Sequence, residues 1–407
     1  MQFEIDARTR KQLEKARHFG ETEARPVGLE ADRLGRPIPI DDPFFKRLIE
    51  RGEGRTRWRG PTSASGAAGQ GTEKSAKHHS KSGRKRPQQT VMSLLYVEEL
   101  AYWDRGVVVA LPGVGLPEAS VLALGTDEQK ERFLGPFREP DRPRWACLAL
   151  TEPGAGSDAA AIQTTARKEG DHYILNGAKC FIGNASRSDW ILVQATLDPS
   201  QGRSAHRSFF VEQGREGLGG YRIEKKMGLK AYESTSFTLQ DCRVPAANLL
   251  GGEARFQQSA GFKTTMRTFN AGRPVVAANA VGIGRAALDE ALAFARERDR
   301  LDDPRVRDRL EQAQRKLKLA RLLCLRAGWL ADEQRPNIVE ASMSKAVAAQ
   351  IGQDVTSLGM ELLGTVAARG DHLIEKLYRD VKAMDIVEGT GQIQRIIMAR
   401  KLVDLPR

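Results

Sequence analysis

The chain has 407 residues, more than one hydrophobic core usually organises, so we expect two or three subdomains. The formal charge of +12 would suit an anionic partner if it were spread evenly, but ten Lys/Arg against two Asp/Glu lie within residues 51–86. The four cysteines lie far apart without a C-x-x-C pair, which argues against a metal site or a disulfide framework and favours a reducing cytosol.

No targeting or membrane segment is predicted from the chain. The N-terminal stretch "MQFEIDARTR" lacks an apolar signal core, and its Glu4 and Asp6 argue against an acid-poor transit peptide. No run of about 18 apolar residues free of charge occurs, which argues against a membrane span. We therefore expect a cytoplasmic protein.

Residues 1–144 have the pattern of a helical domain. Helical spacing is found in "RTRKQLEKARHF", "DPFFKRLIERG", "TVMSLLYVEELAYWDRGVVVAL" and "TDEQKERFLGPF". Thr126 is expected to cap the last of these helices, with Gln129 as its capping-box partner. Residues 54–89 are rich in Gly, Ser and basic residues and nearly free of large aliphatic side chains, which predicts a mobile basic loop.

Residues 145–253 change to short runs typical of strands, such as "HYILNG", "DWILVQATL" and "STSFTLQDCRVP". From 254 to 407 the chain returns to helical spacing, with breaks near 302–304, 335–337 and 364–371. We predict an α+β protein with an all-α N-terminal domain, a small β-barrel or sandwich, and a C-terminal bundle of the four-helix type. Alternating βαβ units are absent, which argues against a Rossmann fold.

The segment "YRDVKAMDIVEGTGQIQR" contains three acidic residues that are candidates for a catalytic role. Only Glu388 is followed by a Gly-Thr-Gly break, where backbone can approach a ligand closely. Asp380 is expected to pair with Arg379 or a neighbouring helix, and Asp385 to lie on a polar helix face. Taken alone, a Glu near a helix end is more often solvated or capping than catalytic.

Three segments in this order resemble the acyl-CoA dehydrogenase family: "LALTEPGAGSD" (148–158), "KMGLKAYESTSFTLQDCRVPAANLLG" (226–251) and "YRDVKAMDIVEGTGQIQR" (378–395). The resemblance implies a non-covalently bound FAD and oxidation of an acyl-CoA to a trans-2-enoyl-CoA in fatty acid β-oxidation. Glu388 would remove the α-proton while a β-hydrogen leaves as hydride to flavin N5. It also implies an electron-transfer flavoprotein as acceptor and a homotetramer or an α2β2 heteromer.

The resemblance also implies site residues, position by position. Phe181 matches the aromatic residue that covers the flavin ring, and Arg273 matches the arginine beside the catalytic carboxylate. Gly272 stands where a few relatives carry the base, so that position cannot act here. The implied FAD contacts are Leu150, Thr151, Gly156, Ser157, Phe181, Gly183, Arg298, Glu361, Gly364, Thr390 and Gln392. The implied substrate contacts are Ser157, Asn270, Arg273 and Gly389.

Several positions depart from the family pattern. Gly183 replaces a Thr whose hydroxyl lies near flavin N5, and Asn270 replaces an Asp near the acyl pocket. Leu301 and Asp302 replace Phe and Gly after Arg298, in a segment that reaches the FAD of a neighbouring subunit. In a second such segment Glu361 and Thr365 replace Gln and Gly. Because the departures gather at subunit contacts, a heteromeric partner would explain them.

Two other classes of function remain open. One is a family member that binds nucleic acid through the basic loop, although that loop has only Trp58 for base stacking and plain phosphate attraction describes it well enough. The other is an inactive subunit that completes the FAD site of another chain. For an active enzyme we expect a medium or long acyl chain, since Gly113 and Gly115 leave the pocket open, with branched or steroid-derived acyl groups as alternatives.

Overall fold

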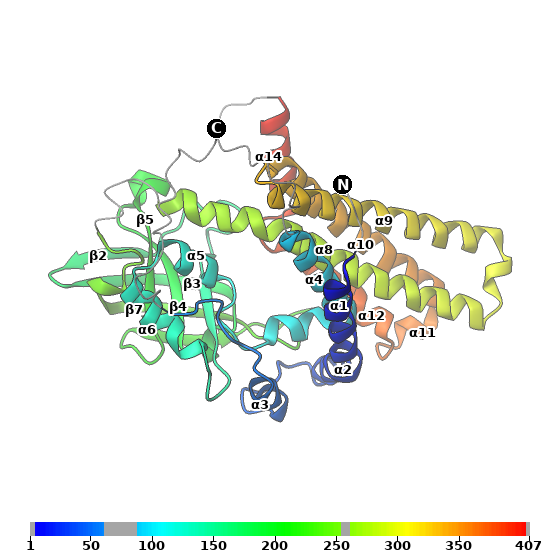
Figure 1. The fold of residues 1–407 in the computed structure, drawn as a ribbon, viewed down its shortest axis with the longest axis horizontal. Coiled ribbons are helices and arrows are strands. Elements are labelled where there is room, and N and C mark those ends of the chain that lie inside the picture. The colour runs from blue at the N-terminus through cyan, green and yellow to red at the C-terminus, as the bar shows by residue number, and fades with distance from the viewer. Residues whose placement is uncertain (1–4, 61–87, 254–260, 404–407) are drawn as a thin grey trace.

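The computed structural model describes residues 5–60, 88–253 and 261–403, with the side chains of 261–271 also outside the description. Helices from both ends of the chain form one elongated half of the molecule, and a β-sheet forms the other half (Figure 1). The long helix α8, Gly261–Glu297, runs from the sheet into the helical half. The predicted order of a helical, a β and a second helical region is confirmed.

The N-terminal helices begin where the sequence supplies caps. Asp6 accepts a hydrogen bond from Thr9 N at 2.7 Å to start the first helix. Thr126 and Gln129 form the predicted capping box, each side chain bonding the other's backbone N–H at 3.2 Å. The helices of this region are α1 (Ala7–Phe19), η1 (Gly20–Ala24), α2 (Arg25–Leu34), α3 (Pro43–Glu50), α4 (Gln89–Ala110), α5 (Pro117–Leu124), α6 (Asp127–Leu134) and η2 (Gly135–Phe137).

The prediction that the mobile loop begins at residue 54 is wrong, because residues 54–60 pack against the helical domain. The Trp58 side chain is only 8% exposed and lies in a core cluster with Val121 and Phe137. Arg57 pairs with Glu118 of α5 at 2.7 Å. Local composition missed this burial because a single Trp supplies the apolar area. Of the rest of the predicted loop, 61–87 lie outside the described residues, and Gln89 already begins α4.

The β-half is one curled sheet in the order β1-β4-β2-β3-β7-β6, with β5 paired to β4. β1 runs parallel to β4, with Ala146 opposite Trp190, whereas β3 runs antiparallel to β7. The β3–β7 register shifts between Lys179 and Ile182, and Phe181 lies within that irregularity. The strands are β1 (Ala146–Ala149), β2 (Thr165–Glu169), β3 (His172–Gly183), β4 (Trp190–Thr196), β5 (His206–Glu212), β6 (Leu218–Ile223) and β7 (Ser234–Pro245).

The C-terminal helices pack on one another and on α4. Gly282 of α8 approaches α4 so closely that a Cβ there would come within 2.3 Å of the Glu98 carbonyl oxygen. The predicted breaks near 302–304 and 335–337 fall where one helix ends and the next begins, whereas the third, 364–371, contains a short helix, Thr365–Ala368. These helices are α8, η6 (Arg300–Asp302), α9 (Pro304–Asp332), α10 (Ile338–Leu363), α11 (Thr365–Ala368), α12 (Leu373–Val381), α13 (Ala383–Ile386) and α14 (Gly391–Leu402). Among the described residues, no helix combines the length and apolar character needed to cross a bilayer.

Candidate active site

Glu388 lies in a tight turn between α13 and α14. Its φ of +55° is left-handed, a conformation that costs a non-glycine residue roughly 1–2 kcal/mol, and Gly389 follows with φ +91°. Gln394 Nε2 holds the turn by donating to the carbonyl oxygens of Glu388 at 3.3 Å and Gly389 at 2.9 Å. Thr390 caps α14 by accepting from Ile393 N at 3.4 Å. Strain held in place in this way is typical of functional sites.

The Glu388 carboxylate points toward α8. Its Oε2 is buried and has no hydrogen-bond partner among the described residues. A Cβ built on Gly272 would lie 1.9 Å from that oxygen, so the glycine leaves the room that the carboxylate occupies. The position that carries the base in a few relatives therefore faces Glu388 directly.

Three cations surround Glu388, each from a different helix. Burial raises the pKa of Glu388, and the charges of Arg105 (α4), Lys345 (α10) and Arg273 (α8) oppose that rise. Lys345 is fully buried with no partner for its Nζ, and burial lowers its pKa to about 8. Arg273 donates to Ser342 Oγ at 3.2 Å, while its Nε has no partner. A carboxyl group whose pKa is raised suits a general base.

Phe181 presents an aromatic face in the β-half. Its side chain is 68% exposed and its φ of +57° is left-handed, two features that a core phenylalanine does not have. The neighbouring Cys180 N donates to the Thr151 carbonyl at 3.0 Å, which fixes the predicted flavin loop beside this ring. An exposed aromatic side chain on strained backbone fits the predicted cover of a planar ring.

A buried ion pair anchors the loop that starts at Leu150. Lys179 bonds Glu152 Oε1 at 2.7 Å and the Leu150 carbonyl at 3.1 Å. Glu152 also accepts from the backbone N–H groups of Gln163 and Thr164. Sequence reasoning missed both charged residues, because no local pattern links positions 27 residues apart.

The outer part of this loop is open. Gly156 and Ser157 are exposed, and a Cβ at Gly156 would meet nothing within 4 Å, so the glycine is not required by packing in the chain itself. The open loop beside an uncovered aromatic ring fits an elongated ligand with a planar end. The residues present therefore fit FAD.

The Phe181 segment is connected to the surroundings of Glu388 by residues of α4 and of the segment before β7. A Cβ at Gly183 would lie 3.6 Å from the Tyr232 ring, and Asn184 Nδ2 donates to the Val109 carbonyl of α4 at 2.9 Å. Tyr232 and Glu388 are both electrostatic neighbours of Arg105. These neighbours link Gly183, two residues after Phe181, through Tyr232 and Arg105 to Glu388.

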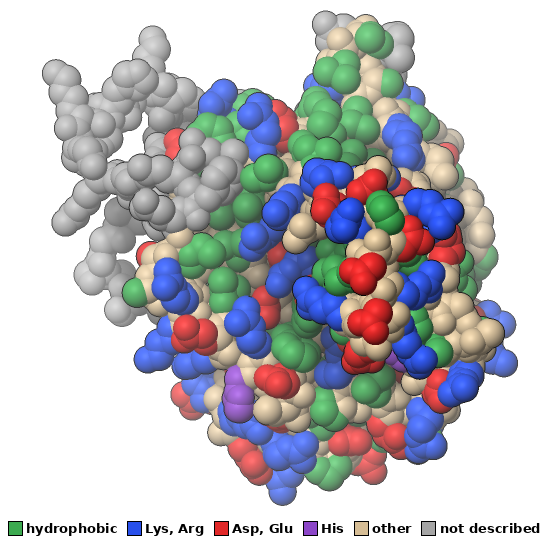
Figure 2. Space-filling model, turned by 90° about the vertical axis from the view of Figure 1, so that its right-hand side faces the viewer, with side chains coloured by type: hydrophobic (Ala, Val, Ile, Leu, Met, Phe, Trp, Pro, Cys, Tyr) green, Lys and Arg blue, Asp and Glu red, His purple; other side chains and the backbone are tan. Residues whose placement is uncertain are grey.

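Several predicted residues do not join this region. Arg298 and Gly364 are exposed at the end of the helical half away from the sheet, as is Glu361, which pairs with Arg309 (Figure 1). On the face in Figure 2, which views the molecule from that end, basic and acidic side chains alternate. Gln392 is exposed on α14. The Asn270 side chain lies outside the described residues.

The two neighbouring aspartates have structural roles that differ from the expectation. Asp380 accepts from Lys376 of its own helix at 2.5 Å and from Leu229 N at 2.5 Å, so the predicted pairing with Arg379 or with a neighbouring helix is wrong. Asp385 is partly buried on α13, and its side chain lies beside the start of α14, where a Cβ at Gly391 would lie 2.3 Å from its Oδ1. Neither competes with Glu388 for the position beside Gly272.

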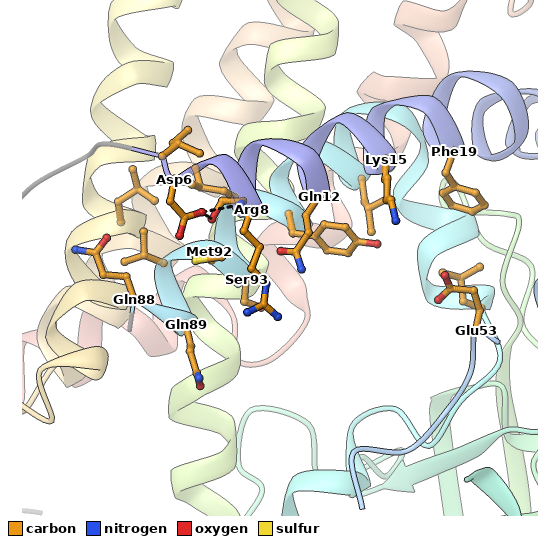
Figure 3. Close-up of a pocket in the computed structure, with 18 of the residues that line it drawn as sticks. Asp6, Arg8, Gln12, Lys15, Phe19, Glu53, Gln88, Gln89, Met92 and Ser93 are labelled. Carbon is orange, nitrogen blue, oxygen red and sulfur yellow. Dashed lines mark hydrogen bonds between the residues drawn. The ribbon is translucent and has the colours of Figure 1, made fainter. Parts of the chain in front are cut away.

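A large cleft in the described part of the chain lies elsewhere. It has a volume of about 1360 Å³ and is lined by α1, α4 and α9 (Figure 3). Arg8, Gln12 and Lys15 of α1 face it, together with Met92 of α4. None of the predicted site residues lines it.

Comparison with known proteins agrees with this geometry. Family models described as the acyl-CoA dehydrogenase middle domain and C-terminal domain match residues 147–242 and 259–403. A 3-(aryl)acrylate reductase of Clostridium sporogenes is 38% identical over 287 residues, covering 69% of this chain and 74% of that protein. The chain belongs to the acyl-CoA dehydrogenase family, whose cofactor is FAD.

Two solved structures are similar over nearly the whole chain. Butyryl-CoA dehydrogenase of Megasphaera elsdenii aligns with a TM-score of 0.82 and 30% identity, covering 99% of this chain and 100% of the other. A structure described with the electron transferring flavoprotein of Acidaminococcus fermentans aligns with a TM-score of 0.81 and 30% identity over the same shares. The predicted fold is confirmed.

Proposed function

We propose that the protein is an FAD-dependent dehydrogenase that converts an acyl-CoA thioester to the trans-2-enoyl-CoA, with Glu388 as the base that removes the α-proton. The observation that carries the proposal is the buried, unpartnered Oε2 of Glu388 facing Gly272. A carboxylate held without hydrogen bonds in a desolvated site is more basic than one in water, as general-base catalysis requires.

The Glu388 turn offers a second group for the reaction. Among the described backbone hydrogen bonds, none uses the Glu388 N–H. This N–H can donate to the thioester oxygen and stabilise the enolate charge that develops when the α-proton leaves. The left-handed φ of Glu388 supports this role, because the strain orients side chain and N–H together.

FAD, when bound, supplies the hydride acceptor for the β-hydrogen. Phe181 would cover its ring, and the loop Leu150–Ser157 with Thr390 would contact the rest of the cofactor. Arg298, Glu361 and Gly364 are exposed at the ends of α8 and α10 that point away from the sheet, so we assign them to a neighbouring subunit of a tetramer or α2β2 heteromer. An electron-transfer flavoprotein is the proposed acceptor, in line with the similar structure described above.

A second candidate is the reverse reaction, favoured by the 38% identity to a 3-(aryl)acrylate reductase. In that direction a 2-enoyl thioester gains two electrons and two protons, and Glu388 protonates the α-carbon. The same residues serve both directions, so the redox partner decides between them.

Anaerobic addition of a panel of acyl-CoAs to the FAD-loaded protein tests the proposal. We expect bleaching of the flavin band in the wild type and a rate lower by about 10²- to 10⁴-fold in Glu388→Gln. Glu333→Gln makes the same change at an exposed position at the end of α9 and should react like wild type. Flavin that no acyl-CoA bleaches would overturn the proposal, and reoxidation of reduced protein by enoyl-CoAs alone would favour the reductase.

A further inference from the structure

Tyr232 lies where the three regions of the chain meet. It precedes β7, whose first residue, Ser234, pairs with Gly183 at the end of β3. Its side chain packs against the core cluster of the N-terminal helices and also against that of the C-terminal helices. Ligand sites commonly lie at such a junction, because the surfaces of several elements converge there.

The ring of Tyr232 occupies the space beside Gly183. A Cβ built on Gly183 would have two atoms of this ring as its nearest neighbours, Cε2 at 3.6 Å and Cδ2 at 3.8 Å. A larger side chain at position 183 would therefore compete with the ring for this space. Gly183 follows the exposed Phe181 by two residues, so the Tyr232 ring lies close to the face that we assign to the flavin.

The backbone around Tyr232 is held by hydrogen bonds on both sides. Lys226 Nζ donates to the carbonyl oxygens of Leu229 at 2.6 Å and Tyr232 at 2.5 Å, and it lies 3.3 Å from the centroid of the Tyr232 ring. The Glu233 carbonyl accepts from Asn184 N at 3.1 Å. These contacts fix the ring before any ligand binds, which lowers the entropy cost of a contact to it.

The same segment packs against a break in α4. Asp104 has extended φ and ψ of −160° and 106°, and the helix resumes after it. A Cβ built on Gly106 would lie 3.3 Å from Ala231 Cβ and from the carbonyl carbon of Leu229. Tyr232, which follows Ala231, is therefore held from the side of α4 as well as from β3.

The hydroxyl group of Tyr232 is available to a ligand. Among the described residues it neither donates nor accepts a hydrogen bond. The hydroxyls of Tyr102, Tyr173 and Tyr221, in contrast, each donate to a carboxylate or amide oxygen. Burial raises the pKa of Tyr232, so its hydroxyl stays protonated at neutral pH and can donate. A partly buried tyrosine hydroxyl normally has a partner.

We propose that the Tyr232 hydroxyl donates a hydrogen bond to the ring system of the bound flavin, beside the face that Phe181 covers. This inference rests on the flavin site of the proposed function. Gly183 has no polar side-chain atom, so position 232 supplies the contact that position 183 does not. Reduced flavin holds two more electrons than oxidised flavin and accepts a stronger hydrogen bond. The bond therefore contributes to FAD affinity and favours the reduced state.

The test measures the bound flavin and needs no substrate. Tyr232→Phe keeps the ring and removes the hydroxyl, so FAD affinity should fall by about threefold to tenfold. The midpoint potential of the bound flavin should fall by about 30 mV, a tenfold change for a two-electron couple. Fluorescence titration of the flavin-free protein gives the affinity, and equilibration with a reference dye of known potential gives the midpoint. Tyr221→Phe removes a β6 hydroxyl that donates to Gln213 at 2.8 Å, and it should change neither quantity.

A double variant moves the hydroxyl to the facing position. Tyr232→Ala empties the space beside Gly183, and Gly183→Ser places a hydroxyl in it. The two changes together should recover part of the midpoint potential that Tyr232→Ala alone has lost. Such a recovery separates a contact to the flavin from a role in packing, because the double variant restores the hydrogen-bond donor and not the ring.

Three results would overturn the role of Tyr232. One is an unchanged FAD affinity and midpoint potential in Tyr232→Phe. Another is a lower Tm of flavin-free Tyr232→Phe without any change in the flavin, because the hydroxyl would then serve the fold alone. Slower oxidation of acyl-CoA at an unchanged midpoint would place the hydroxyl against the substrate. If no acyl-CoA bleaches the flavin, the proposed function fails, while a lower midpoint in Tyr232→Phe would still support the flavin contact.

Discussion

Gly272 and Glu388 meet across the site so closely that a single methyl group on Gly272 would lie 1.9 Å from the carboxylate oxygen. Gly272→Ala is therefore expected to displace the carboxylate and slow substrate oxidation by about 10²-fold, because a shift of about 1 Å in a reacting group has that effect. Stopped-flow reduction of the bound flavin measures this rate. A variant that reacts like wild type would mean that Glu388 adopts another position when substrate binds.

The reciprocal exchange tests the same relationship from the other side. Since the two positions face each other, a carboxylate moved to α8 can occupy the space that Glu388 leaves. Gly272→Glu combined with Glu388→Gly should recover part of the activity that Glu388→Gly alone has lost. A double variant as inactive as the single one would show that the turn, and not only the carboxylate, is required.

The three cations around Glu388 predict the pH dependence of the reaction. A base must be ionised, so kcat/KM should rise with pH through the pKa of Glu388, which burial raises and the cations hold down. Lys345→Met removes one opposing charge and should move the acidic limb to higher pH, whereas Lys345→Arg should move it little. A shift to lower pH in Lys345→Met would contradict this electrostatic account.

The same pKa shift predicts a change in stability. Because the native protein holds the Glu388 proton more tightly than the unfolded chain, the free energy of unfolding falls as pH rises from the unfolded pKa through the native one. Glu388→Gln removes this dependence. Its Tm should equal that of wild type near pH 4 and exceed it by a few degrees at pH 8, as measured by calorimetry of the flavin-free protein. A Tm advantage that stays the same at both pH values would contradict the linkage.

Local signals in the sequence predicted local structure well. The capping box of Thr126 and the breaks between the C-terminal helices depend on residues a few positions apart, and the structure has both. The strand pattern also located β3, β4 and β7. It missed β2 and β6, because neither the polar Thr-Ala-Arg-Lys-Glu stretch nor the Gly-Gly-Tyr-Arg stretch alternates apolar and polar residues. The burial of Trp58 depends on contacts with α5 and η2 that composition cannot express.

The candidate active site was even harder to predict from local sequence than the fold. Glu388 could be singled out because Gly-Thr-Gly follows it and because the surrounding segment resembles a known family. Arg105 could not, since one basic residue in an apolar helix is usually read as a residue of the solvated face. Only the break at Asp104 and the assembly of α4, α8 and α10 bring it to the carboxylate, and both are properties of the folded chain.

Phe181 is expected to matter for FAD and not for the stability of the chain. At 68% exposure it buries little area, so Phe181→Ala should leave the Tm of the flavin-free protein nearly unchanged. Loss of the ring contact should weaken FAD binding about tenfold, or about 1.4 kcal/mol. Fluorescence titration of the flavin-free protein measures the affinity. Ile223→Ala, at a half-exposed position of β6, is the control and should change neither quantity.

Lys179, in contrast to Phe181, is expected to matter for the stability of the chain. It is fully buried and bonds both Glu152 and the Leu150 carbonyl, so Lys179→Met leaves a buried carboxylate without its counter-ion. Removing one partner of such a pair costs about 3–5 kcal/mol, and the backbone donors that Glu152 keeps favour the lower end. Urea unfolding of the flavin-free protein measures the loss. The double variant Lys179→Met/Glu152→Gln should recover part of the lost stability, because no unpaired buried carboxylate remains. If Lys179→Met alone stays within about 1 kcal/mol of wild type, the ion pair does not anchor the flavin loop.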